Sequence, residues 1–140
     1  MTPMIYNWYA ANVKALRMVF GEVEHHRRSF KWILIHNYKL PECFNQRLSA
    51  LLILTPEEKL TIPDSFGFFL NQKLVRTDGM PTNRLHDRGS YNPYKKKGYS
   101  RLSFHLDDFR PNLNRAKEGD TFIDICFSLY HFLGDARGVL

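Results

Sequence analysis

Apolar residues recur at helical spacing near both ends of the chain. Between residues 5 and 20 they fall three or four positions apart, as in an amphipathic helix, and Gly21 follows as a stop signal. Residues 120–133 repeat this spacing, with Asp120 as the expected N-cap and Gly134 as the expected stop. The pattern predicts one helix near each end of the chain.

The segments between these helices have the composition of strands. Residues 29–38 and 47–55 are rich in aliphatic and aromatic side chains, and residues 65–70 add three phenylalanines. A fourth, short strand is expected at 102–106. The long polar stretch 78–101 is predicted to be irregular, and such stretches in compact domains usually serve a function. Together these elements predict an α+β fold in which helices cover one face of an antiparallel meander of three to four strands.

The size and composition of the chain favour one intracellular domain. With 140 residues, 16.5 kDa and 44% apolar residues, it is large enough for a single core, and we treat residues 1–140 as one domain. Cys43 and Cys126 lack the spacing of a disulfide framework or a zinc site, so no metal or cofactor is predicted. The first residues do not resemble a secretory signal, and no segment reaches the roughly 18 apolar residues of a membrane span. A soluble, cytoplasmic protein without a membrane partner is expected.

A net charge of +6 raises the question of an acidic partner. Residues 25–28 form a small basic cluster, and a larger one lies around the polar stretch, comprising Arg84, Arg88, Lys95, Lys96, Lys97 and Arg101. These charges suit solvated loops or an acidic protein partner. The alternative is a nucleic-acid-binding module, in which Tyr91, Tyr94 and Tyr99 stack on bases while the lysines bind phosphates.

A series of short motifs supplies a family resemblance. The motifs are Leu40-Pro41, Phe44-Asn45, Ile62-Pro63-Asp64-Ser65-Phe66, Asp78-Gly79, Gly98, Ser103-Phe104-His105 and Phe109-Arg110-Pro111. Their order, over residues 8–133, resembles the ubiquitin-conjugating-enzyme superfamily and, more narrowly, a bacterial branch of it. The resemblance implies an N-terminal helix, a strand meander, an extended active-site stretch, an aromatic-x-Pro motif and a further helix.

The chemistry implied by this resemblance needs a cysteine that the sequence lacks. Such enzymes carry their protein substrate as a thioester on a cysteine shortly before the aromatic-x-Pro motif, because a thiolate is both nucleophilic and a good leaving group. Arg101, flanked by Ser100 and Leu102, occupies that place here. The family's His-Pro-Asn element is also missing, and Asn83 is only a weak stand-in for its oxyanion-supporting asparagine.

The remaining candidates for catalysis fit poorly. Cys126 falls on the apolar face of the last predicted helix, where a thiol behaves as a small hydrophobe. Cys43 falls in the turn between the first two predicted strands and is expected to lie away from the polar stretch 78–101. It is the first residue to test if the protein is catalytic. His105, ahead of two aspartates, is a candidate general base, although a structural role is the commoner one for such a residue. A hydrolase using Ser100 or Ser103 with His105 is the least favoured hypothesis.

The sequence therefore predicts a conjugating-enzyme-like protein that binds rather than catalyses. Its expected partner is a ubiquitin-like protein, its activating enzyme or a conjugating enzyme. By resemblance, the setting is a bacterial ubiquitin-like conjugation pathway, a type of system associated with antiphage defence. The predicted partner-binding residues are Lys14, Arg17, Tyr91, Tyr94, Lys95, Lys96, Lys97, Tyr99 and Arg101. An active conjugating enzyme that uses Cys43 and a nucleic-acid-binding module remain the alternatives.

Overall fold

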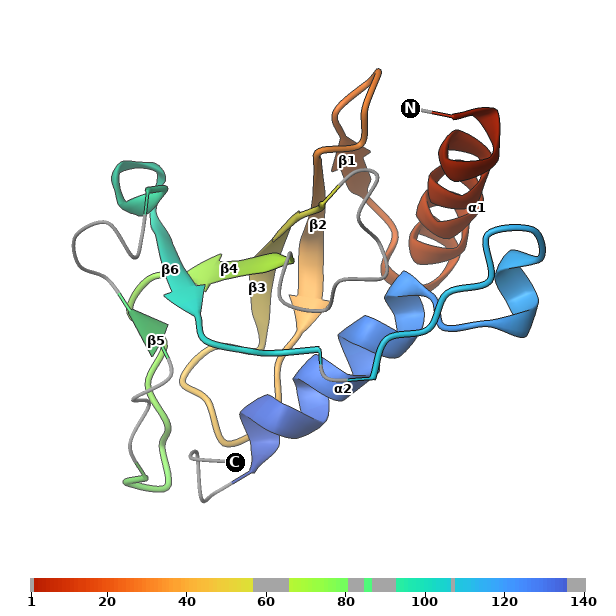
Figure 1. Ribbon diagram of the computed structural model, residues 1–140. Helices are drawn as coiled ribbons and strands as arrows, with labels where there is room; N and C mark the ends of the chain where they lie inside the picture. Colours follow the sequence, from red (N-terminus) through yellow and green to blue (C-terminus); the bar gives the residue numbers. More distant parts are fainter. Residues whose placement is uncertain (1, 57–65, 81–84, 87–92, 107, 136–140) are drawn as a thin grey trace.

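The protein folds as a helix, an antiparallel sheet and a second helix. The computed structural model describes residues 2–56, 66–80, 85–86, 93–106 and 108–135. Helix α1 (Pro3–Phe20) opens the chain, and helix α2 (Phe122–Gly134) lies near its end. Figure 1 shows both helices on the same side of the sheet. The predicted α+β class, with one helix near each end, is confirmed.

The described residues form a six-stranded antiparallel sheet with the order β1-β2-β3-β4-β6-β5. The strands are β1 (Val23–His25), β2 (Trp32–Lys39), β3 (Leu48–Leu54), β4 (Gly67–Asn71), β5 (Leu85–His86) and β6 (Tyr99–Leu102). Two single turns of 3-10 helix, η3 (Lys95–Lys97) and η4 (Ala116–Glu118), lie in the connections.

The predicted number of three to four strands is wrong. Strands β1 and β5 have three and two residues, too few for an alternating pattern to emerge. Strand β6 lies mostly inside the stretch that was predicted to be irregular, and the strand expected at 102–106 ends instead at Leu102. The inward residue Ser100 is 3% exposed, and this polar residue at a core position hides the alternation from sequence analysis.

The ends of the helices follow capping rules, with two differences from the prediction. Gly21 ends α1 as expected, at a φ of 79° that favours glycine. Thr121 rather than Asp120 caps α2, because the Asp124 carboxylate accepts the backbone N–H of Thr121 at 2.8 Å. Gly134 is the last residue of α2 instead of its stop, and Asp135 follows as the C-cap.

The core lies between the helices and one face of the sheet. Fully buried side chains come from alternate positions of the strands, such as Ile33, Ile53 and Phe68. They meet Trp8 on α1 and Phe122 on α2, whose ring centroids are 5.6 Å apart. This inner layer is predominantly apolar, with Ser49 and Ser100 as buried polar exceptions, so its burial is the main source of stability.

Two buried hydrogen bonds fix the position of α2. The Asn12 side chain accepts the backbone N–H of Phe122 at 2.8 Å and donates to the Trp8 carbonyl at 2.9 Å. At the other side of α2, the Tyr38 hydroxyl donates to the Cys126 carbonyl at 2.7 Å, and burial raises the pKa of this phenol. Buried polar groups need partners. The bonds of Asn12 to Phe122 and of Tyr38 to Cys126 meet this need by joining α2 to α1 and to β2.

Among the described residues, no helix is long and apolar enough to cross a membrane.

Candidate functional site

The place of the expected catalytic cysteine is a strand. Arg101 lies on β6 and pairs with Phe69 on β4 and with His86 on β5. Its side chain belongs to the face of the sheet opposite the helices, because its neighbours Ser100 and Leu102 are buried in the core. The described residues around Arg101 include no cysteine, so this position offers no thiol for a thioester.

Cys126 is inaccessible to a partner protein. It is 1% exposed on the buried face of α2, and burial raises the pKa of its thiol well above the usual range. A thiol in this setting stays protonated and packs as an apolar side chain. The expectation of a structural role for Cys126 agrees with this burial.

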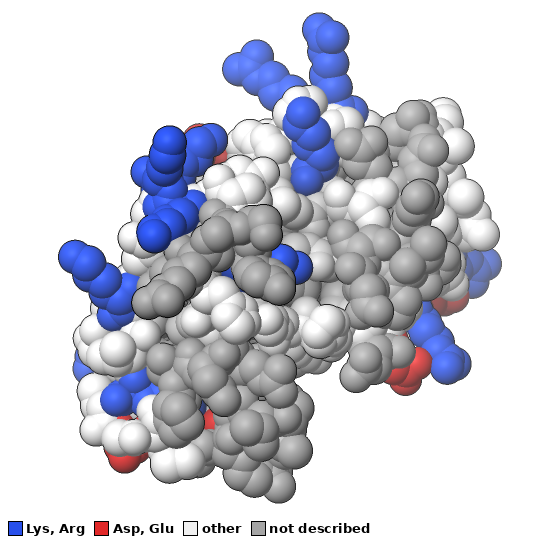
Figure 2. All heavy atoms as spheres, turned by 60° about the vertical axis from the view of Figure 1, so that its left-hand side comes forward, with Lys and Arg blue, Asp and Glu red and all other residues white. Residues whose placement is uncertain are grey.

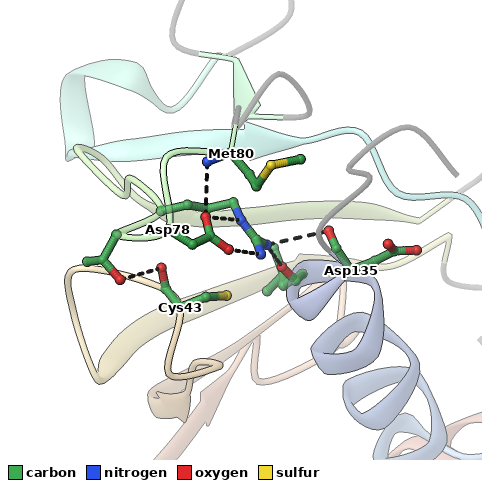
Figure 3. Close-up of polar contacts among 7 residues, drawn as sticks. Cys43, Asp78, Met80 and Asp135 are labelled. Atoms are coloured by element: carbon green, nitrogen blue, oxygen red, sulfur yellow. Dashed lines mark hydrogen bonds and ion pairs between the residues drawn. The ribbon is translucent and has the colours of Figure 1, made fainter.

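Cys43 lies nearer to the polar stretch than the sequence suggested. Its carbonyl accepts hydrogen bonds from the Thr77 backbone N–H and, at 3.1 Å, from the Thr77 hydroxyl. An isolated bridge between Phe44 and Arg76 brings the chain after β4 back alongside this turn. Figure 3 shows Cys43 beside Asp78, where the polar stretch begins. The expectation that Cys43 lies away from the polar stretch is therefore wrong.

A network of polar contacts centred on Arg76 lies beside Cys43. The Arg76 guanidinium donates to both carboxylate oxygens of Asp78, at 3.1 and 2.6 Å, and to the carbonyl of Leu133 at 2.8 Å (Figure 3). The hydrogen bond with Asp78 raises the pKa of Arg76, and the same bond lowers the pKa of Asp78. Because Arg76 binds the end of α2, its charge serves to anchor the helix.

His105 is exposed and lies at a shallow hollow that also involves Asp108, Asp120 and Asp124. Two of these carboxylates accept backbone hydrogen bonds, Asp120 from Arg110 and Asp124 from Thr121, both at 2.8 Å. The carboxylates of Asp120 and Asp124 thus stabilise the backbone at the start of α2.

The serine hypothesis stays a prediction. The Ser103 hydroxyl lies 2.8 Å from Nε2 of His86, and Ser100 is buried. The described residues contain no cluster of three or more His, Cys, Asp or Glu side chains that could hold a metal ion.

The predicted partner-binding residues fall into two groups. Lys14 and Arg17 are exposed on α1, and the Arg17 guanidinium donates through two nitrogens to the Val23 carbonyl, at 3.2 and 3.1 Å. Residues 94–101 lie around η3 and β6, at the other side of the molecule in Figure 1. Asn83 and Tyr91 lie outside the described residues.

The second group borders an apolar groove on the face of the sheet opposite the helices. The groove has a volume of about 180 Å³. Its walls come from β2, β3, the η3 segment and β6, and they consist of Trp32, Leu34, Leu52, Leu54, Tyr94, Lys97 and Tyr99. Most of these side chains are half-buried, and Leu52 retains 8% exposure. We call this surface the outer groove.

A cross-strand row forms the floor of the outer groove. The strand register places Glu24, Leu34, Leu52, Phe69 and Arg101 opposite one another, from β1 to β6. The row is apolar in its centre, basic at one end and acidic at the other. Such an arrangement gives a partner both an apolar contact and a charge direction.

The tyrosines are walls of this groove. The Tyr94 ring packs edge-on against Phe69, with centroids 5.0 Å apart, and the Lys97 ammonium lies 5.7 Å from the Tyr94 ring centroid. Burial raises the pKa of Tyr99, and Glu24 adds a smaller contribution of the same sign. The sheet therefore positions both rings: Tyr94 packs on Phe69 of β4, and Tyr99 belongs to β6.

The face that carries β6 and η3 is predominantly basic. Figure 2 shows more Lys and Arg than Asp and Glu side chains on it. The three lysines of η3 are exposed and adjoin the outer groove. An acidic surface is the complementary partner.

Sequence analysis found the rim of the outer groove but missed its floor. In the sequence, the floor residues look like ordinary strand residues; they are Trp32, Leu34, Leu52 and Leu54. The signal lies in the continuous apolar runs of residues 32–35 and 51–54, which make both faces of β2 and β3 apolar.

Comparisons with family models, with curated proteins and with solved structures gave no match for this chain.

Proposed function

We propose that this protein is a non-catalytic binding module with a ubiquitin-conjugating-enzyme-like scaffold, of the bacterial branch of that superfamily. The order of its elements supports the proposal: α1 is followed by the meander β1 to β4 and, after the remaining strands, by α2. The motif Phe109-Arg110-Pro111 precedes α2, as the resemblance implies. Fold resemblance alone does not give a function, so the proposal rests on the outer groove.

The observation that carries the proposal is the outer groove. It presents half-exposed Trp32, Leu34 and Leu54 on a sheet face without a helix over it among the described residues. Apolar positions that the core does not require commonly mark an interaction surface. Aromatic side chains are frequent anchors at such surfaces.

The charges beside the groove favour a protein partner with an acidic rim. Lys95, Lys96 and Lys97 are exposed at one end, where they would steer an acidic surface onto the apolar floor. By the family resemblance, this partner is a ubiquitin-like protein, its activating enzyme or a conjugating enzyme. The same resemblance supplies the link to a bacterial conjugation pathway with a role in antiphage defence.

The absence of a suitably placed thiol supports binding without catalysis. Arg101 occupies the position in the sequence where the resemblance places the nucleophile, and Cys126 is buried. Binding by such a protein would orient or sequester its partner, while another protein performs the covalent step.

A thioester assay separates the binding module from an enzyme. The protein is incubated with ATP, a bacterial ubiquitin-like protein and its activating enzyme, and is then analysed by non-reducing electrophoresis. We expect no thiol-sensitive adduct, whereas an adduct that Cys43→Ala abolishes would establish a conjugating enzyme. Cys126→Ala is the matched control, because it removes the other thiol of the chain.

An active enzyme using Cys43 is the second candidate function. It is favoured by the contact between Cys43 and Thr77, which brings this half-buried thiol beside the polar stretch. The nearby Arg76 guanidinium is already bonded to Asp78 and to the end of α2.

Nucleic-acid binding is less well supported by the tyrosines. Tyr94 packs against Phe69 and Tyr99 is half-buried, so neither ring is a free platform for a base. The test is a titration with a single-stranded oligonucleotide at several salt concentrations. A steep salt dependence that is lost on replacing Lys95, Lys96 and Lys97 by glutamine would favour this alternative.

A further inference from the structure

A second hollow lies between α1 and the turn that joins β1 to β2, and it shares Trp32 with the outer groove. It has a volume of about 820 Å³ and is open to solvent. Its principal side chains are Arg17, His25, His26, Arg27, Arg28 and Trp32. We call it the hairpin hollow. Its volume is within the usual range for small-molecule sites.

The charge around the hairpin hollow is strongly positive. Arg17, Arg27 and Arg28 are exposed, and none of them forms an ion pair with a described residue. Among the described residues that line the hollow, the one carboxylate belongs to Glu24, which lies 2.8 Å from Nε2 of His36 on the neighbouring strand. Three guanidinium groups without a paired acid produce a potential that attracts anions. In Figure 2, Lys and Arg side chains project from the top, the end at which Figure 1 places the β1–β2 turn.

The turn that carries these charges is fixed by its own hydrogen bonds. The backbone N–H of Ser29 donates to Nδ1 of His26 at 3.2 Å, and the Phe30 N–H donates to the His26 carbonyl at 3.3 Å. Nδ1 of His25 donates to the same carbonyl at 3.0 Å, because a carbonyl oxygen can only accept. A fixed turn lowers the entropy cost of bringing its arginines to a ligand.

Ring stacking attaches the turn to the core. The His25 ring stacks on Phe30 with centroids 4.5 Å apart, and Phe30 stacks on the buried Tyr9 at 5.3 Å. On the α1 side, Arg17 is held by the Val23 carbonyl and still has N–H groups to offer, because a guanidinium carries five. The hollow thus has an ordered wall on both sides.

We propose that the hairpin hollow binds the phosphate chain of a small phosphorylated ligand. Guanidinium groups suit phosphate because their planar N–H pairs match two of its oxygens. Three such groups match a ligand with several phosphates better than a ligand with a single carboxylate. Trp32 lines the same hollow and is half-buried, so its ring adjoins the site where a base attached to the phosphates would lie. The phosphate contacts rest on the three arginines, which do not line the outer groove, and Trp32 is a side chain that both surfaces share.

Isothermal titration calorimetry with sodium tripolyphosphate, at about 0.15 M salt, tests the proposal. The double variant Arg27→Gln/Arg28→Gln should weaken binding by about tenfold or more. Lys39→Gln/Lys73→Gln is the matched control, because it removes the same charge from two exposed lysines that do not line the hollow and should leave binding within about twofold. Equal loss in both variants, or no saturable binding to the unmodified protein, would overturn the proposal.

Two further arms identify the source of the phosphate chain. ATP that binds more tightly than tripolyphosphate, with the difference removed by Trp32→Ala, indicates a nucleotide; equal affinities indicate a free polyphosphate chain. Both results support the hollow as a phosphate site. A single-stranded oligonucleotide that displaces tripolyphosphate and loses affinity equally in Arg27→Gln/Arg28→Gln and in Lys95→Gln/Lys96→Gln would overturn the small-ligand proposal, because it would show one long nucleic-acid surface. Unchanged urea midpoints of the variants establish that they are folded.

Discussion

The two faces of the sheet use the same strands for different purposes. On the face toward α1 and α2, Ile53 is fully buried in a continuous core. On the opposite face, its neighbour Leu54 lines the half-exposed outer groove. Both residues are aliphatic and adjacent, and only the alternation of side chains along β3 separates them. The difference shows that hydrophobic character in this strand exceeds what the core needs, and the excess lies beside a row of lysines.

Adjacent alanine substitutions in β3 give the largest expected contrast. Ile53→Ala should lower the free energy of unfolding by about 3 kcal/mol, because it leaves a cavity in the core. Leu54→Ala should cost about 1 kcal/mol or less, since its side chain is half-exposed. Urea denaturation of both variants measures the difference. Equal losses would show that the outer face is as much a core as the inner one.

Removal of the Arg76 anchor should destabilise the helix layer. Arg76→Met loses the charged hydrogen bond to the Leu133 carbonyl and should cost about 2 kcal/mol. The matched control is Arg115→Met, because Arg115 is exposed and its only ion pair within the described part of the chain is with Glu118, so about 0.5 kcal/mol or less is expected. Denaturation followed by circular dichroism measures both. A loss for Arg115→Met as large as that for Arg76→Met would contradict the anchoring role.

Charge placed in the outer groove should abolish partner binding with little loss of stability. Leu34→Glu puts a carboxylate on the apolar floor and should weaken binding of the partner by about tenfold or more. Met18→Glu is the control, because Met18 is 82% exposed on α1. Calorimetry with a ubiquitin-like protein or its activating enzyme compares them. Binding that survives Leu34→Glu would place the partner elsewhere.

The acid sensitivity of the Arg76 anchor is the smallest expected effect. Arg76 lowers the pKa of Asp78 in the folded protein, so this pair contributes stability above the unfolded pKa of about 4 and loses it as the pH falls through the lower folded value. The stability difference between the natural protein and Asp78→Asn should therefore shrink below about pH 4. Urea midpoints measured across this range provide the test. A difference that is constant with pH would mean that the ion pair contributes nothing.

Much of the fold could be predicted because its long elements are strongly periodic. The α1 and α2 helices and the central strands β2, β3 and β4 were each expected from spacing and composition, with ends shifted by a few residues. Strands β1 and β5 could not be predicted, because two or three residues carry no readable period. Strand β6 exists through its pairing with β4, which is a long-range contact that local sequence does not encode.

The candidate site could be predicted only at its edges. Tyr94, Lys97 and Tyr99 were chosen because they are aromatic or basic, and the structure brings them to one groove. Its floor depends on the register that sets Leu34 opposite Leu52, and register follows from tertiary pairing. The position of Cys43 was misjudged for the same reason, since the bridge between Phe44 and Arg76 closes the chain over a distance that spacing cannot reveal.

The central claim is that a partner docks on the outer face of the sheet. Its most direct test is a heteronuclear NMR titration of the amide-labelled protein with a ubiquitin-like protein and, separately, with its activating enzyme. We predict that shift changes concentrate at Trp32, Leu34, Leu52 and Tyr99 around the outer groove. Changes centred on Cys43 and Thr77, with the outer groove unaffected, would contradict the claim.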